Sequence, residues 1–382
     1  MVLNNNSDKS KKLIIYSASP FFDTWPKKFK LDKFKNYGFE VELWSAEEIF
    51  FKLENIKNAA SGSSEYLYRD LDIIKIKSLA ELENKIAELN PKAIVCIMNL
   101  GSLNDNEFDN PDLNFFNKYK IKYTLHHLCP YTVVPNMWSE LKFNIRLLQK
   151  RMNNHKKKPS LIIGTGSEGR KQVFKIYKKN FIYKSVPSYN VLWTKEDPII
   201  NDRYIVYAEE SVNAPPDAAL IGYDKPTYDI EGFYKRINNV LEKIESWTNF
   251  RVIIAASGKY DYKINPFKNR EIIYKKTSNL IQHSELVIGH SSLALEQAIV
   301  EYKPLLIIND EGFNDLKNKI NYNFARSYRL NPIWTNQFTK NVFEKHNCVN
   351  FEIYNEIITK YLKEDNVDGT FINNITSAFH HI

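Results

Sequence analysis

A glycine, a histidine and two serines interrupt an apolar stretch in the second half of the chain. Gly289, His290, Ser291 and Ser292 stand between the short run LVI and a run with helical spacing, LALEQAIV. Glycine lets a backbone approach a ligand closely, and either serine can cap the following helix. A helix N-terminus with free N–H groups attracts anions, so this segment predicts a site for a phosphate or diphosphate.

Glu296 lies four residues beyond Ser292, which places it on the same helical face about 6 Å further along the axis. A carboxylate there can accept hydrogen bonds from two sugar hydroxyls of a nucleotide whose phosphates lie at the cap. The alternative is that Ser292 is only a helix cap, His290 lies in a surface loop and Glu296 is solvated. Each residue alone fits both interpretations, and their combination favours the phosphate site.

Polar residues also follow two other expected strands of this half. Ser257, Gly258 and Lys259 come after VIIAA, where they can bring N–H groups and a positive charge to a phosphate, or form an ordinary Ser-Gly turn. Glu209 and Glu210 come after YIVY. They can bind acceptor hydroxyls or act as a catalytic base if partial burial raises their pKa, or they can be solvated loop carboxylates.

The first half offers weaker candidates. Ser17 and Ser19 follow the first expected strand, and Gly166 and Ser167 lie in GTGSEG after a later one. That segment lacks the ending of a P-loop and the glycine spacing of a dinucleotide-binding loop. His126 ends the strand KYTL, where its imidazole can act as a base or pack in the core, and a histidine pair alone makes no metal site.

The elements that must position these residues follow the pattern of βα units around parallel sheets. Expected strands of the first half span residues 12–16, 39–43, 73–76, 93–97, 122–125 and 161–163. Those of the second half span 204–207, 252–256, 271–274, 286–288 and 305–308, with helical periodicity over 230–247. A capping box, Ser78 to Glu81, opens the helix LAELENKIAEL. We therefore predict an α/β protein with two Rossmann-like domains facing a central cleft.

The length of 382 residues exceeds what one hydrophobic core normally organises, so two domains are expected. The segment WTKEDPIINDR, which contains proline and aspartate, has the composition of a connection between them. We place the N-terminal domain at residues 1–195. The C-terminal domain covers residues 196–382 and includes a helical tail.

Composition narrows the function classes. The net charge of +8 is modest and spread along the chain, which fits an anionic substrate or membrane surface better than a nucleic-acid groove. Cys96, Cys129 and Cys348 are too few and too scattered for a disulfide framework or a four-ligand metal site. The polar start MVLNNNSDKSKK and the lack of a long apolar run predict a soluble, cytoplasmic protein, at most peripheral at the inner face of the membrane. We expect metal-independent chemistry and no cofactor.

The order of strand, Gly-His-Ser-Ser, helix with Glu-Gln-Ala and then Lys-Pro-Leu-Leu resembles the donor-binding unit of GT-B glycosyltransferases, particularly bacterial enzymes that build capsule or lipopolysaccharide glycans. The likeness covers residues 204–310, and the first half is similar only as a generic Rossmann-like domain. The resemblance implies a glycosyltransferase that moves a sugar from a nucleotide-sugar donor to a surface glycan or lipid-linked glycan. It also implies that the C-terminal domain is the nucleotide-sugar donor side and that the N-terminal domain, with its candidate residues, is the acceptor side.

Two alternatives stay open beside that resemblance. Nucleotide-sugar 2-epimerases share the architecture, although a richer set of acidic and histidine residues is expected around their cleft. Related transferases carry His-Pro after the VIIAA strand, where this chain has Ser257 and Gly258. The missing histidine keeps a catalytically silent glycan- or nucleotide-binding protein among the candidates.

Overall fold

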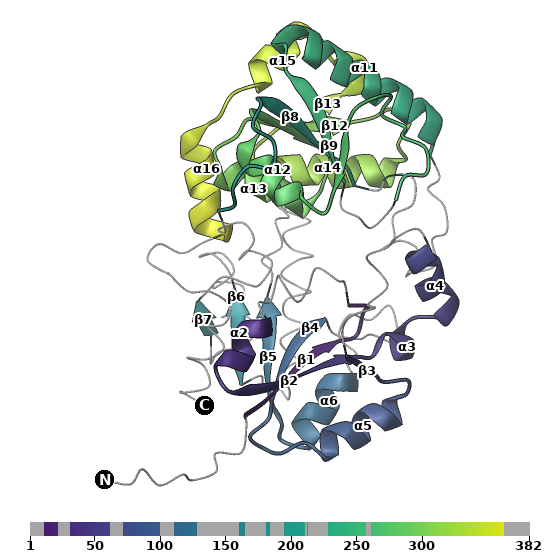
Figure 1. Ribbon diagram of the computed structural model, residues 1–382, viewed down its shortest axis with the longest axis vertical. Coiled ribbons are helices and arrows are strands. Elements are labelled where there is room, and N and C mark those ends of the chain that lie inside the picture. The colour runs from purple at the N-terminus through teal and green to yellow at the C-terminus, as the bar shows by residue number, and fades with distance from the viewer. Residues whose placement is uncertain are drawn as a thin grey trace, which may run out of the picture.

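The chain folds around two parallel β-sheets, each in its own lobe (Figure 1). The structure is a computed structural model that describes residues 11–21, 31–61, 72–99, 111–127, 160–164, 181–183, 195–210, 212, 228–256 and 261–362. Two parallel-sheet α/β domains of the Rossmann-like kind are thereby confirmed. Among the described residues, no helix is both long and apolar enough to cross a bilayer.

The first sheet has seven strands in the order β3-β2-β1-β4-β5-β6-β7. Its strands are β1 Lys11–Ser17, β2 Phe39–Ser45, β3 Ile73–Lys75, β4 Ile94–Asn99, β5 Lys122–His127, β6 Leu161–Gly164 and β7 Phe181–Tyr183. The helices described in this half are α2 Leu31–Asn36, α3 Glu47–Phe50, α4 Leu53–Ser61, α5 Leu79–Ala87 and α6 Pro111–Lys118. All six predicted strands are present, and β7 was missed because three residues carry almost no periodicity.

The predicted capping box opens α5. The Ser78 hydroxyl oxygen accepts a hydrogen bond from the Glu81 N–H at 3.1 Å. The Glu81 carboxylate reaches back one residue further than in the usual box and accepts from the Lys77 N–H at 2.8 Å. The Ser78 contact satisfies a backbone donor that the first turn of a helix leaves without a partner, and the Glu81 contact holds the residue before the cap.

The second sheet has six strands in the order β10-β9-β8-β11-β12-β13. Its strands are β8 Tyr204–Ala208, β9 Arg251–Ala256, β10 Ile272–Tyr274, β11 Leu286–Gly289, β12 Leu305–Asn309 and β13 Ile333–Trp334. Its α-helices are α11 Ile230–Thr248, α12 Thr277–His283, α13 Glu296–Val300, α14 Asp315–Ser327, α15 Lys340–His346 and α16 Phe351–Ile357. The 3₁₀-helices are η3 Leu293–Leu295 and η4 Thr335–Gln337, and η5 Ile358–Leu362 is a π-helical turn. The two-residue β13 is the strand of this sheet that the sequence pattern did not predict.

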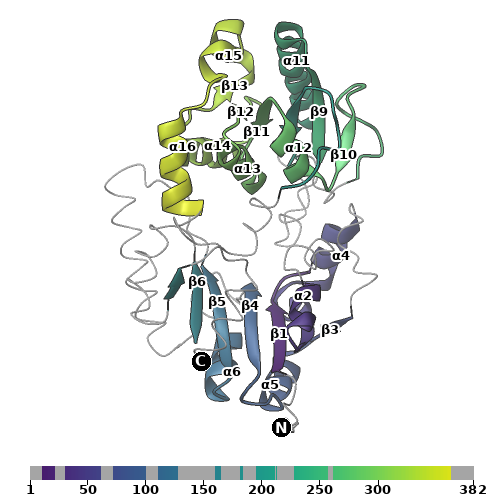
Figure 2. The same cartoon turned by 60° about the vertical axis from the view of Figure 1, so that its left-hand side comes forward.

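Alternate side chains of β8 enter different layers of the second domain. Tyr207 packs in one apolar cluster with Phe233 of α11, whereas Val206 packs in the other with Leu280 of α12. In both views the strands lie between α11 and α15 on one side and α12 and α13 on the other (Figures 1 and 2). Because both faces of a parallel sheet are covered, its strands read as continuous apolar runs, which is why they were recognised from the sequence.

The strand order also fixes where a ligand belongs. From the central strand β8 the chain moves outward through β9 to β10, and then returns to β11 on the other side of β8. Connections that leave in opposite directions create a crevice beyond the carboxyl ends of β8 and β11, and open α/β sheets bind ligands at such a switch point.

Candidate functional site at the carboxyl ends of β8 and β11

Three side chains meet at this switch point from three elements. Glu210 follows β8, Ser291 follows β11, and Lys317 lies in the first turn of α14. The Glu210 carboxylate accepts hydrogen bonds from the Ser291 N–H and, at 3.3 Å, from its hydroxyl. The Lys317 ammonium donates to Glu210 Oε2 at 2.7 Å and to Ser291 Oγ at 3.0 Å. Glu210 and Ser291 were predicted site residues, and the structure brings them together.

The polar contacts decide the charge of Glu210, whose side chain is 14% exposed. Burial alone would raise the pKa of Glu210, but the Lys317 ammonium and the Ser291 N–H more than offset burial and hold that pKa below its ordinary value. The raised pKa on which the hypothesis of a catalytic base depended is not found for Glu210 in this arrangement, and a catalytic role for Glu210 stays a prediction.

Lys317 was missed by the sequence reasoning. It stands among other lysines in DLKNKI, and nothing in that pattern distinguishes it. A signal was nevertheless present three residues earlier. Asn314 caps α14 and accepts from the Lys317 N–H at 2.8 Å, which places Lys317 in the first turn after β12, at the same edge of the sheet.

His290 lies in the core, neither in a surface loop nor facing outward, and has no exposed surface. Its Nδ1 is 2.7 Å from the Ile308 carbonyl oxygen, and its Nε2 is 2.7 Å from the Tyr207 hydroxyl. Since a carbonyl only accepts, Nδ1 carries the proton, and Nε2 then accepts from Tyr207. Phe233 and Phe313 pack against the ring at 5.6 and 5.5 Å between centroids. Both ring nitrogens are thus used in holding the Gly-His-Ser-Ser loop to β8 and β12.

The burial of His290 predicts a pH-dependent stability. Burial lowers the pKa of His290 below its ordinary 6.5, an effect that nearby Glu210 opposes and Lys317 reinforces. The unfolded chain therefore binds a proton at a pH where the folded chain does not, and stability is lost as pH falls below about 6.5, by up to about 1.4 kcal/mol per pH unit. Urea unfolding between pH 5 and 8 measures this loss.

A matched pair of variants assigns that loss to its residue. His290→Gln should flatten the profile near pH 6, because glutamine takes up no proton. His283→Gln, at the end of α12 and hydrogen-bonded to the Glu196 carbonyl, should keep the wild-type profile. An identical slope in His290→Gln and wild type would contradict the assignment.

Ser292 and Gly289 shape the turn around His290. Ser292 is the N-cap of η3, with its hydroxyl oxygen accepting from the Ala294 N–H at 3.3 Å, so the predicted cap is confirmed. Gly289 is required for a reason that the sequence did not show. A Cβ at this position would lie 2.7 Å from Cδ2 of the buried Leu295. The glycine therefore lets η3 fold closely over the end of β11.

Glu296 is the first residue of α13 and is 1% exposed, so it is not a solvated helix residue. Its Oε1 accepts a hydrogen bond at 3.1 Å from the hydroxyl of Tyr328, which follows α14. Burying a carboxylate is costly unless polar partners surround it. The predicted contact between Glu296 and a ribose stays a prediction.

Glu209 is 5% exposed and anchors its own loop by accepting from the Val212 N–H at 3.1 Å. The Tyr262 hydroxyl also bonds to this carboxylate, and burial together with the charge of Glu209 raises the pKa of Tyr262. The two neighbouring carboxylates thus differ in environment: Glu209 faces backbone and tyrosine, and Glu210 faces Lys317. A role for Glu209 toward an acceptor stays a prediction.

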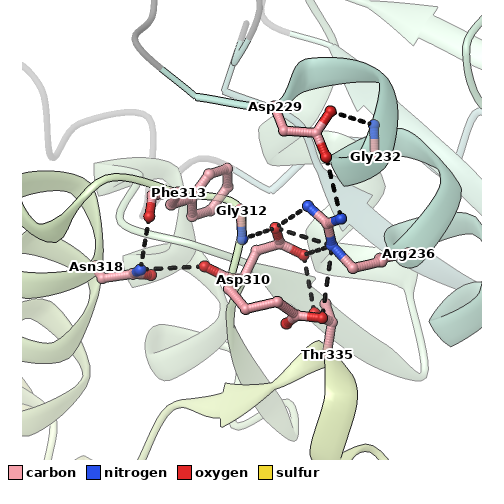
Figure 3. Close-up of polar contacts among 9 residues, drawn as sticks. Asp229, Gly232, Arg236, Asp310, Gly312, Phe313, Asn318 and Thr335 are labelled. Atoms are coloured by element: carbon pink, nitrogen blue, oxygen red, sulfur yellow. Dashed lines mark hydrogen bonds and ion pairs between the residues drawn. The ribbon is translucent and has the colours of Figure 1, made fainter.

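A second polar cluster, which the sequence analysis did not single out, supports the loop between β12 and α14 (Figure 3). Arg236 of α11 forms a forked ion pair with Asp310, with Nε 2.9 Å from Oδ2 and Nη2 2.6 Å from Oδ1. We call this pair the clamp. Asp310 has no exposed surface and also accepts from the Thr335 hydroxyl and the Gly312 N–H, both at 2.8 Å. Its backbone carbonyl accepts from Asn318 of α14 at 3.1 Å, which ties the helix carrying Lys317 to this clamp.

Two glycines make room for the Arg236 guanidinium. A Cβ on Gly312 would lie 2.0 Å from Nη2, and a Cβ on Gly232 would lie 2.6 Å from Nη1. Asp310 lies two residues after the predicted strand 305–308 and directly follows β12, so its position at the ligand-binding edge of the sheet was a usable signal. Its partner lies 74 residues earlier in the chain, which no local pattern indicates.

No protein-family model matches the sequence, and no curated protein sequence matches it either. Solved structures do match over nearly the whole chain. The calicheamicin glycosyltransferase CalG4 is 9% identical, with a TM-score of 0.51 over 98% of this chain and 99% of that chain. A putative UDP-N-acetylglucosamine 2-epimerase from Listeria monocytogenes is 13% identical, with a TM-score of 0.50 over 97% and 98%. The chain has the GT-B fold. At these identities the likeness establishes the fold alone.

The remaining predicted site residues lie apart from this site or outside the described residues. In the first domain, Ser17 is the last residue of β1, and its hydroxyl donates to the carbonyl of Ser19 in the following bend at 2.7 Å. His126 lies in β5, and its side chain is outside the described part of the structure. Among the described residues, no group of three or more His, Cys, Asp or Glu could hold a metal. Five predicted residues lie outside the described ones: Gly166, Ser167, Ser257, Gly258 and Lys259.

Proposed function

We propose that this chain is a glycosyltransferase that takes its sugar from a nucleotide-sugar donor bound at the carboxyl ends of β8 and β11. The observation that carries the proposal is the meeting of Ser291 and Lys317 at the switch point of the second domain. A backbone N–H, a hydroxyl and an ammonium converge there on one carboxylate, and the same donors suit a phosphate oxygen.

Ser291 and Lys317 would stabilise the negative charge that develops on the departing phosphate. When a glycosyl group moves, the bond from its anomeric carbon to the phosphate oxygen breaks, a bond from that carbon to the acceptor hydroxyl oxygen forms, and the acceptor hydroxyl gives up its proton to a base or to solvent. The departing nucleotide keeps the electron pair, so negative charge grows on its phosphate. An ammonium and an N–H already positioned at that phosphate stabilise the growing charge without reorganising. Ser292 and Glu296, on the following helical segment, are proposed to hold the rest of the nucleotide.

The acceptor we propose is a bacterial surface glycan, of the capsule or lipopolysaccharide kind, free or lipid-linked. Support comes from the resemblance of residues 204–310 to the donor-binding unit of such transferases. A net charge of +8 is compatible with an anionic glycan or with peripheral contact at a membrane surface. We propose that the enzyme works in the cytoplasm.

Product analysis tests the proposed reaction. The full chain is incubated with a panel of nucleotide sugars, with and without glycan acceptors, in magnesium and in chelator. We expect a glycosylated acceptor and released nucleotide, with similar turnover in chelator. An epimerised sugar nucleotide formed without acceptor would assign the chain to the 2-epimerases, whose architecture the Listeria protein shares. Binding without any product would leave a glycan- or nucleotide-binding protein.

A further inference from the structure

The Glu210 carboxylate occupies the position that suits an incoming anion. It accepts from the Ser291 N–H and hydroxyl and lies 2.7 Å from the Lys317 ammonium. These are the donors that a phosphate oxygen would require at this edge of the sheet. Two negatively charged groups cannot share them, because like charges at such short range repel strongly, above all where water is partly excluded.

The surroundings of Glu210 allow its side chain to leave without rebuilding the loop. Glu209 fixes the backbone next to it through the Val212 N–H, so the loop keeps its anchor. The contacts of Glu210 with Ser291 and Lys317 are made by its carboxylate, so a change of rotamer withdraws the side chain from both residues. The side chain is 14% exposed, so part of it already contacts water.

We propose that Glu210 is an internal ligand of the Ser291–Lys317 site, and that a phosphate group must displace its carboxylate in order to bind. The inference deepens the proposed function, on which the identity of the ligand as a nucleotide sugar rests. Glu210 lowers the affinity for phosphate and holds the Lys317 side chain in place while the site is empty. Displacement makes ligand binding and the release of Glu210 one coupled event.

Calorimetric titration of the full chain with inorganic phosphate and with diphosphate tests the proposal. Glu210→Gln keeps the shape of the side chain and removes its charge, so phosphate affinity should rise roughly tenfold. Glu285→Gln is the matched control. Glu285 pairs with Arg203 at 2.8 Å at the opposite, amino end of the same strands, and its loss should change phosphate affinity less than twofold.

Glu210→Asp provides a second variant in case the glutamine variant does not fold, as judged by thermal melting. Its shorter side chain keeps the charge but reaches Ser291 less well, so phosphate affinity should rise by a smaller factor. Unchanged affinity in the folded variants would overturn the proposal, because phosphate would then bind elsewhere or not at all. Weaker binding would also overturn it, since Glu210 would then be a residue that positions Ser291 and Lys317 for the ligand.

The phosphate titration can be told apart from the test of the proposed function, because one measures phosphate affinity and the other measures turnover of nucleotide sugars. Raised phosphate affinity in Glu210→Gln, together with no turnover of any nucleotide sugar by the wild type, would support the internal ligand and reject the transferase. Turnover by the wild type, with no change of phosphate affinity in Glu210→Gln, would support the transferase and reject the internal ligand.

Discussion

Arg236→Met is expected to lower the free energy of unfolding by about 2–4 kcal/mol, the largest stability effect among the variants considered. Methionine keeps much of the side-chain volume but leaves Asp310, which has no exposed surface, without its forked partner. Breaking a buried ion pair by removing one member costs about 3–5 kcal/mol, and we reduce that figure because the Arg236 side chain is 25% exposed. Urea unfolding of the two proteins at pH 7 measures the difference.

Two further variants separate the ion pair from the loss of packing. Asp310→Asn in the Arg236→Met background should cost less than the sum of the single changes, with a coupling of about 1–3 kcal/mol. Arg326→Met, on the exposed side of α14, should stay within about 0.5 kcal/mol of the wild type. Equal losses for Arg236→Met and Arg326→Met would contradict the importance of the clamp.

Lys317→Met is expected to weaken the binding of nucleoside diphosphates about tenfold to a hundredfold. A hydrogen bond from a charged group contributes about 1.5–3 kcal/mol, and 1.4 kcal/mol corresponds to a factor of ten. The dependence of binding on salt should also become weaker, because a positive charge at the phosphate is lost. Calorimetry at two salt concentrations measures both effects on the same protein.

Lys319→Met is the control for Lys317→Met. It makes the same substitution two residues further along α14, at an exposed position, and should leave affinity and salt dependence unchanged. Lys317→Arg keeps the charge and should retain much of the affinity. If Lys317→Met binds nucleoside diphosphates as the wild type does, the ammonium does not contact the phosphate, and the donor site proposed at β11 is wrong.

What the sequence determined by itself about this protein is its local structure. The apolar or β-branched runs that became β1 to β6 and β8 to β12 were predicted from their composition, most clearly for the strands β8, β9, β11 and β12, because a strand buried on both faces must be apolar. The helix caps at Ser78 and Ser292 were predicted because a cap acts within three residues of itself. The break after β11 was correctly recognised as a turn at the edge of a sheet.

Only the tertiary structure decided which of the polar residues meet. Glu210 and Ser291 are 81 residues apart, and Glu210 and Lys317 are 107 apart. Their contact depends on β8 and β11 being neighbours, which is a property of strand order and not of any local pattern. His290 was expected in a loop near a ligand, and it became a core residue because aromatic rings from α11 and from the β12–α14 loop enclose it. The charge of Glu210 was likewise undetermined in the sequence, because desolvation and the Lys317 ammonium shift its pKa in opposite directions, and both act only in the folded protein.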